Sequence, residues 1–156
     1  MSGPYEYAVG RTWEPISLQI TRSRLRFFAK ATGQTDPIYT DVEAAQQAGH
    51  PDLPVPPTFL FGVDFETEDP FAWYAELEID LRTVLHGGQD FSYHRLVHAG
   101  ETITAHPQLR KTYDKRGGAL IFLERVITYR DGEGETVAEA TTTVIIPSQH
   151  TVEEAL

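Results

Sequence analysis

Three long segments with the alternating pattern of β-strands occupy most of the C-terminal third of this sequence and most restrict how it can fold. They span residues 102–113, 119–129 and 135–146. The short stretches between them, 114–118 and 131–134, contain the Asp and Gly residues typical of hairpin turns. Strands joined this closely pair antiparallel, so the pattern predicts an antiparallel sheet.

The N-terminal half is patterned for short helices. Thr21 or Ser23 is suited to cap a helix whose apolar face carries Leu25 and Phe28. Gly33 follows where a left-handed residue commonly ends a helix. We therefore expect one helix between these signals.

Two further helical segments are predicted before the sheet. Asp41 is placed to cap a second short helix, which ends near Gly49. Pro57 suits the first position of a third, because its missing N–H would be unpaired there. The next residues are apolar nearly all round, so this helix should be buried on every side: Phe59, Leu60, Phe61 and Val63. An antiparallel sheet wrapped round a buried helix makes an α+β domain.

The composition is that of a soluble globular protein. The chain has 156 residues, and we expect one domain over 1–150 followed by an acidic tail over 151–156. No apolar run approaches the ~20 residues that span a bilayer, and the N-terminal residues do not resemble a signal peptide. The sequence has no cysteine, which removes disulfides and thiolate metal sites and fits a cytoplasmic location.

The net charge of −10 makes nucleic acid and anionic membranes poor partners. One local exception holds four of the thirteen basic residues within seven positions: Arg110, Lys111, Lys115 and Arg116. This basic cluster either binds an anionic ligand or is an ordinary solvated hairpin tip. The histidines lack the spacing of a zinc site, so no metal is expected.

Several ordered segments resemble MaoC-like hydratases and dehydratases, in particular the N-terminal MaoC (FAS1-like) dehydratase subfamily. They are 27–41, 55–59, 86–95 and 99–102, and the resemblance extends over roughly residues 5–147. It implies a hot dog fold, in which an antiparallel sheet wraps a long central helix, normally paired as a double hot dog. It also implies acyl thioesters of coenzyme A or acyl carrier protein as ligands, with no other cofactor.

Active members of this family hydrate trans-2-enoyl thioesters, or run the reverse, with an Asp and a His of one motif and a Gly amide at the start of the central helix. Aligned on Gly33 and Pro37, the motif's Asp falls on Gln34 and its His on Tyr39. Gln34 accepts no proton at neutral pH, and an ordinary Tyr, with a pKa near ~10, is a poor base. The amide falls on Pro57, which has no N–H. Hydration needs a base for water, an acid for the substrate carbon and a donor for the thioester oxygen, and all three are weakened at the aligned positions.

Three residues are candidates to replace the missing acid–base pair. Asp36 is either a base or the acceptor of an Asx-turn. Tyr39 either donates to a bound carbonyl or packs against the loop. His86 either reaches a shared cleft or is a residue of a Gly-rich turn.

The resemblance also suggests residues for substrate binding. Pro57, Thr58, Phe59 and Phe61 lie where an acyl chain would run beside the central helix, although such aromatic residues are also what a core needs. The basic cluster is the candidate for holding phosphates of coenzyme A or an acidic carrier.

In heterodimeric relatives one hot dog has lost the catalytic pair and supports the acyl chain, while its partner supplies Asp and His. This sequence resembles that supporting half. Two alternatives remain open: an active homodimer with a non-standard site, and a non-enzymatic protein that binds acyl thioesters. Each predicts a dimer, because a lone hot dog exposes a sheet edge.

Overall fold

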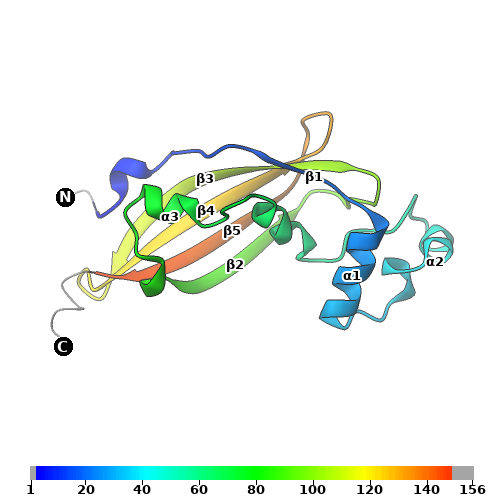
Figure 1. Cartoon of the computed structure of the whole chain (residues 1–156), viewed down its shortest axis with the longest axis horizontal. Coiled ribbons are helices and arrows are strands. Elements are labelled where there is room, and N and C mark those ends of the chain that lie inside the picture. The colour runs from blue at the N-terminus through cyan, green and yellow to red at the C-terminus, as the bar shows by residue number, and fades with distance from the viewer. Residues whose placement is uncertain (1–2, 149–156) are drawn as a thin grey trace.

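The computed structural model describes residues 3–148, so the expected acidic tail lies outside the described residues. A single antiparallel sheet and short helical segments make up the chain (Figure 1). The helical segments are η1 (Glu6–Ala8), α1 (Arg22–Thr32), η2 (Pro37–Tyr39), α2 (Val42–Gln47), η3 (Phe59–Phe65), α3 (Ala72–Glu76) and η4 (Leu81–Thr83). The strands are β1 (Ile16–Gln19), β2 (Leu85–Tyr93), β3 (Thr102–Lys115), β4 (Leu120–Arg130) and β5 (Thr136–Pro147).

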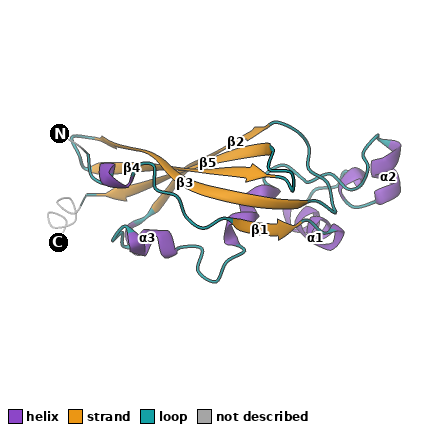
Figure 2. Cartoon of the chain, turned by 90° about the horizontal axis from the view of Figure 1, so that it is seen from above, coloured by secondary structure: helices purple, strands orange, loops and turns teal. Residues whose placement is uncertain are grey.

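The five-stranded sheet has the order β1-β3-β4-β5-β2, and every neighbouring pair is antiparallel. The two predicted hairpins, β3–β4 and β4–β5, are present. Figure 2 shows α1 and α3 on the same side of the sheet, with α2 beyond its end. This is the α+β hot dog fold that the resemblance implies.

The expected helix caps are present. The side chain of Thr21 accepts a hydrogen bond from the N–H of Arg24, and Gly33 ends α1 at a φ of 69°. Asp41 accepts hydrogen bonds from the N–H groups of Glu43 and Ala44 at the start of α2. Each cap satisfies backbone groups that have no partner within the helix.

The central helix is much shorter than the resemblance implies, because η3 is a seven-residue 3-10 helix. Thr58 precedes its first residue with a left-handed φ of 72°. The prediction that Pro57 occupies the first helical position is therefore wrong, because Pro57 lies before the cap. Only one side of η3 is buried, with Gly62 and Phe65 exposed, so burial on every side was also wrong. Three of its seven residues are Phe and one is Val, all weak helix formers, which disfavours a longer helix here.

Two clusters of buried side chains lie beneath the sheet. One contains Leu60 and Val63 of η3 with Ile127 and Tyr129 of β4. The other contains Trp73 and residues of β3, β4 and β5. The first cluster anchors η3 next to the loop that resembles the hydratase motif.

Candidate functional site

A small apolar pocket of about 80 Å³ lies where three segments meet: the start of η3, the end of β2, and the loop of residues 33–41, which resembles the hydratase motif and is called the hydratase-like loop below. Its lining comes from three separate segments of the chain: Tyr39, Val55, Pro57, Leu60, Tyr93, Arg95, Leu96 and Val97. No Asp or His is among these described residues. The pocket can hold an apolar group, but its own walls supply no carboxylate or imidazole for proton transfer.

The hydratase-like loop is held by its own polar groups. The carboxylate of Asp36 accepts a hydrogen bond from the N–H of Ile38 at 3.1 Å, and Pro37 begins η2. Gln34 Oε1 accepts from the N–H of Asp36 at 3.1 Å. Asp36 is exposed and forms the Asx-turn that was one of its two predicted roles. Tyr39 is half-buried and borders the pocket.

The backbone N–H of Thr58, the residue before η3, has a hydrogen-bond partner from outside the helix. The N–H of Thr58 donates to Tyr93 Oη at 2.9 Å, and Tyr93 is the last residue of β2. Pro57 beside it has no N–H to offer. At the position that the resemblance assigns to the oxygen-binding amide, Pro57 therefore offers no N–H, and the neighbouring Thr58 amide is already bonded to a phenol.

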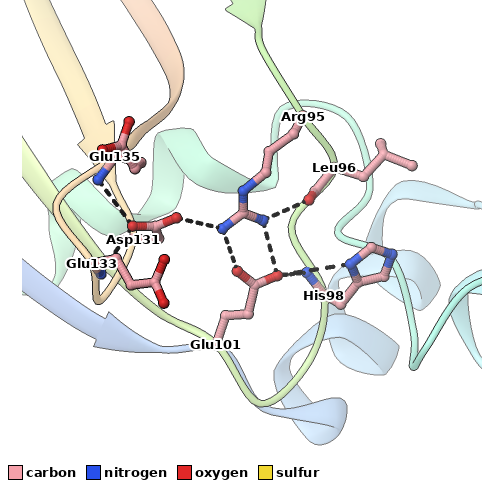
Figure 3. A network of polar contacts seen from close by, with 7 residues as sticks. All are labelled: Arg95, Leu96, His98, Glu101, Asp131, Glu133 and Glu135. Carbon is pink, nitrogen blue, oxygen red and sulfur yellow. Dashed lines mark hydrogen bonds and ion pairs between the residues drawn. The ribbon is translucent and has the colours of Figure 1, made fainter.

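Arg95, which lines the pocket, is the centre of a network of polar contacts (Figure 3). Arg95 donates to Glu101 at 2.7 and 3.2 Å, to Asp131 at 2.8 Å and to the carbonyl of Leu96 at 2.8 Å. Asp131 in turn accepts from the N–H groups of Glu133 and Glu135, both at 3.0 Å. The cluster ties the segment after β2 to the β4–β5 turn.

These contacts shift the pKa values of the groups involved. Hydrogen bonds to Glu101 and Asp131 raise the pKa of Arg95. The hydrogen bond from Arg95 lowers the pKa of Asp131. Burial by itself raises the pKa of Glu101, but hydrogen bonds from Arg95 and from the N–H of His98 outweigh it, and the net shift is downward.

His98 joins the same cluster to the segment after α2. Its Nε2 lies 3.3 Å from His50 Nδ1, and its Nδ1 lies 3.7 Å from Glu101 Oε1. Burial lowers the pKa of His98, so the ring is neutral near pH 7. The imidazole contact links the segment after α2 to the segment after β2, and the N–H of Val55 donates to the carbonyl of Val97 between the same two segments.

Of the predicted acyl-lining residues, only Pro57 borders this pocket. Thr58 is exposed and meets Tyr93 through its backbone. Phe59 is 8% exposed and packs edge-on against Phe28 at 5.3 Å, as a core residue does. Phe61 packs edge-on against Phe65 at 5.2 Å.

Two other predicted groups lie away from the pocket. His86 is an exposed residue of β2 opposite Val144, beside a β-bulge, and not part of a turn as expected. Seven residues of strand separate it from Tyr93, which is about 23 Å at 3.3 Å per residue. The basic cluster runs from Arg110 within β3 to Arg116 in the β3–β4 turn, and this turn lies at the opposite end of the sheet from α1 and α2 (Figure 1). Within one chain these groups and Tyr39 do not form one site.

Tyr93 and Arg95 are functional candidates that residue patterns alone did not single out. Alternation places Tyr93 on the same strand face as Phe91, and the sequence offers no further signal that its hydroxyl meets Thr58. Of the two carboxylates that Arg95 binds, Glu101 lies six residues later in the sequence and Asp131 lies in the distant β4–β5 turn. Only the sheet brings these groups together.

A second hollow of about 440 Å³ contains the buried Arg125–Asp64 ion pair. Trp13 and Trp73 lie 5.7 and 5.2 Å from the Arg125 guanidinium. Within residues 3–148, no three His, Asp or Glu side chains are grouped to hold a metal ion. In that same range, no helix is long and apolar enough to cross a membrane.

Comparison with known proteins gives consistent matches along most of the chain. A family model described as "FAS1-like, dehydratase domain region" matches residues 7–140. A UPF0336 protein of Streptomyces coelicolor is 35% identical over 138 residues, which are 88% of this chain and 91% of the relative.

Solved structures share the fold. A MaoC-like dehydratase superposes with a TM-score of 0.81 at 22% identity, over 93% of this chain and 44% of that one. The C-terminally truncated HadBC complex of Mycobacterium tuberculosis, described as a (3R)-hydroxyacyl-ACP dehydratase, gives a TM-score of 0.74 at 23% identity, over 88% and 96% of the two chains.

Proposed function

The chain belongs to the FAS1-like, dehydratase domain region family, and from this membership we propose that it is the acyl-chain-supporting subunit of an (R)-specific enoyl-thioester hydratase or 3-hydroxyacyl-thioester dehydratase. A catalytic MaoC-like partner supplies the Asp and the His. The substrate is an acyl thioester of coenzyme A or acyl carrier protein, which places the reaction in cytoplasmic fatty acid metabolism.

The observation that carries this proposal is the state of the pocket beside Thr58. Hydration requires a base for water, an acid for the substrate carbon and a donor for the thioester oxygen. The pocket lining among the described residues has no Asp or His, and Tyr93 occupies the Thr58 amide. Such a site supports an apolar chain better than it moves protons.

A partner subunit is supported by the sheet edge. β2 pairs with β5 on one side only, which leaves nine residues of strand with a free edge among the described elements. A long unpaired edge is a template for another strand. The HadBC structure, which superposes on this chain, is itself described as a complex.

The test is reconstitution. The chain is purified alone and co-purified with a MaoC-like subunit that retains the motif's Asp and His, and crotonyl-CoA hydration is measured for each. We expect no turnover from the lone chain and turnover from the complex. Full activity of the lone chain overturns the proposal, because it would require an acid–base pair from this sequence.

The homodimeric alternative has a geometric argument of its own. If two copies pair antiparallel along β2, His86 of one copy approaches the Tyr93 end of the other. Asp36, Tyr39 and His86 would then be replaced by Ala one at a time in the lone chain. A homodimeric enzyme loses activity in at least one of these variants, whereas a supporting subunit has none to lose.

A further inference from the structure

The sheet has an outer face, on the side opposite the two buried clusters. Side chains alternate along β4, and Leu123 and Ile127 belong to the clusters, so Phe122 and the alternate residues after it point to the other side. The helices α1 and α3 both lie on the side of the clusters (Figure 2). The outer face is therefore left for solvent or for another protein.

An apolar row crosses the outer face near the β3–β4 turn. The register aligns one residue from each of four neighbouring strands in this row: Tyr113, Phe122, Ile145 and Leu85. The row is about 14 Å long at ~4.8 Å per strand spacing. Leu85 is 58% exposed, and the other three residues are half-buried. A contiguous apolar row of this kind is stabilised by burial against a second apolar surface.

The neighbouring rows of the outer face are polar and carry charges of both signs. Arg110 of β3 donates to Thr141 Oγ1 of β5 at 3.2 Å and lies 3.9 Å from Glu124, so its side chain crosses β4 on this face. Lys111 is opposite Glu124 in the register. Asp90 of β2 is exposed, and no ion pair within residues 3–148 includes it. Cations thus lie on the β3 side of the face and an unpaired carboxylate on the β2 side.

This arrangement is complementary to itself under a twofold rotation. An axis parallel to the strands and between β4 and β5 exchanges β3 with β2 and keeps every row at the same height. It sets Tyr113 against the partner's Leu85, and Phe122 against the partner's Ile145. It also sets the cations of β3 against the strand that carries the partner's Asp90. Apolar residues then meet apolar residues and opposite charges face each other, as a twofold interface requires.

The outer face is also large enough for a specific interface. The eleven residues of β4 extend about 36 Å, and four strands are about 19 Å wide, which gives about 700 Å² in plan. A standard interface buries ~800 Å² on each partner. Two sheets can pack face to face in this way with their strands nearly aligned.

We propose that the outer face packs against the outer face of a second copy of this chain, about this twofold axis. The interface is distinct from the β2 edge, because face-to-face packing uses side chains and leaves the backbone groups of that edge free. It therefore goes beyond the proposed function: it joins two copies of the supporting subunit, each of which keeps its edge for a catalytic partner.

The first test is the mass of the assembly, measured by sedimentation velocity on the lone chain and on the reconstituted complex. Leu85→Glu puts a charge into the apolar row at an exposed position. We expect the mass to halve in both samples, whether or not the β2 edge is paired. Phe27→Glu changes an aromatic residue of α1 that is 75% exposed and lies on the other side of the sheet, and it should keep the wild-type mass. Equal masses for the wild type and Leu85→Glu would overturn the proposal.

A second test separates the outer face from the β2 edge by cross-linking. The sequence has no cysteine, so introduced thiols report only the chosen positions. Chains with Tyr113→Cys and chains with Leu85→Cys are mixed and treated with a short bismaleimide linker. We expect a cross-link between the two variant chains, because the twofold axis sets these positions against each other. Antiparallel pairing of two β2 edges cannot produce it, since Tyr113 lies on β3, three strands away from β2.

The control for the cross-link is a mixture of Phe27→Cys and Leu85→Cys chains, which should remain uncross-linked. Failure of Tyr113→Cys to link to Leu85→Cys under conditions where the wild type is associated assigns the association to another surface and refutes the outer-face interface. A link that forms, and that is lost when Asp90→Lys is added to both chains, supports the charge pattern as well as the apolar row.

Discussion

Asp64 of η3 and Arg125 of β4 form a buried bidentate ion pair, with hydrogen bonds of 2.5 and 3.0 Å. Both residues are less than 8% exposed. The pair links the short central helix to the middle strand of the sheet, and the chain's only two tryptophans pack over the guanidinium. The ion pair thus joins η3 to β4 beside the apolar packing of Leu60 and Val63.

Asp64→Ala should destabilise the fold by about 3–5 kcal/mol, because it leaves a buried guanidinium without its carboxylate. Chemical denaturation followed by tryptophan fluorescence measures this. Glu68→Ala, on the exposed loop after η3, is the control and should stay within about 0.5 kcal/mol of the wild type. A loss of similar size in both variants would contradict the assigned role of the pair.

Tyr93→Phe removes the acceptor of the Thr58 N–H. We expect a stability loss of about 1 kcal/mol, the usual net value of one hydrogen bond, and faster exchange of the Thr58 amide hydrogen. Hydrogen exchange resolved at Thr58 is the measurement. Tyr7→Phe, at a tyrosine that is 75% exposed, should leave that exchange rate unchanged. Unaltered exchange in Tyr93→Phe would show that the phenol does not protect this amide.

The Arg95 cluster predicts loss of stability in acid. Glu101 and Asp131 have lowered pKa values in the folded chain, so the unfolded chain binds more protons and stability is lost as pH falls through their folded pKa values. His98, whose folded pKa is also lowered, adds a loss with the same sign just below its ordinary value of 6.5.

The variant that checks this is Arg95→Met. It should lower the free energy of unfolding at pH 7 and flatten its dependence on pH between about 3 and 5, since the two carboxyl groups return toward ordinary pKa values. Arg26→Met, which removes only a bond to the Thr40 carbonyl, should keep the wild-type slope. Equal slopes in wild type and Arg95→Met would refute the linkage.

Gly87→Ala should destabilise β2 at its bulge. An added Cβ would lie 2.8 and 2.9 Å from Ile145 side-chain atoms and 3.2 Å from the Thr143 carbonyl. Overpacking of this kind costs about 1–3 kcal/mol. Thermal unfolding measures the loss, and Ile145→Ala in the same chain should recover part of it. Gly88→Ala, with nothing within 4 Å, is the matched control.

Features that act over a few residues were predictable. Thr21, Gly33 and Asp41 mark the helix ends because capping depends on groups two to four positions away. The hairpin strands follow from alternation and turn residues. The Asx-turn at Asp36 depends only on Pro37 and the N–H of Ile38, so the sequence could predict it as one of two roles for Asp36.

The sequence by itself predicted the three long strands and the helix caps, and the family resemblance aligned Gln34 and Tyr39 with the motif's Asp and His. Only the tertiary structure decided that Tyr93 occupies the Thr58 amide, that Arg95 joins Glu101 to Asp131, and that the basic hairpin lies a full strand length from the pocket. The physical reason is separation along the chain. Caps and turns are bonded within one or two turns of backbone, whereas contacts across 30 or more residues exist only once strand order and register bring those residues together.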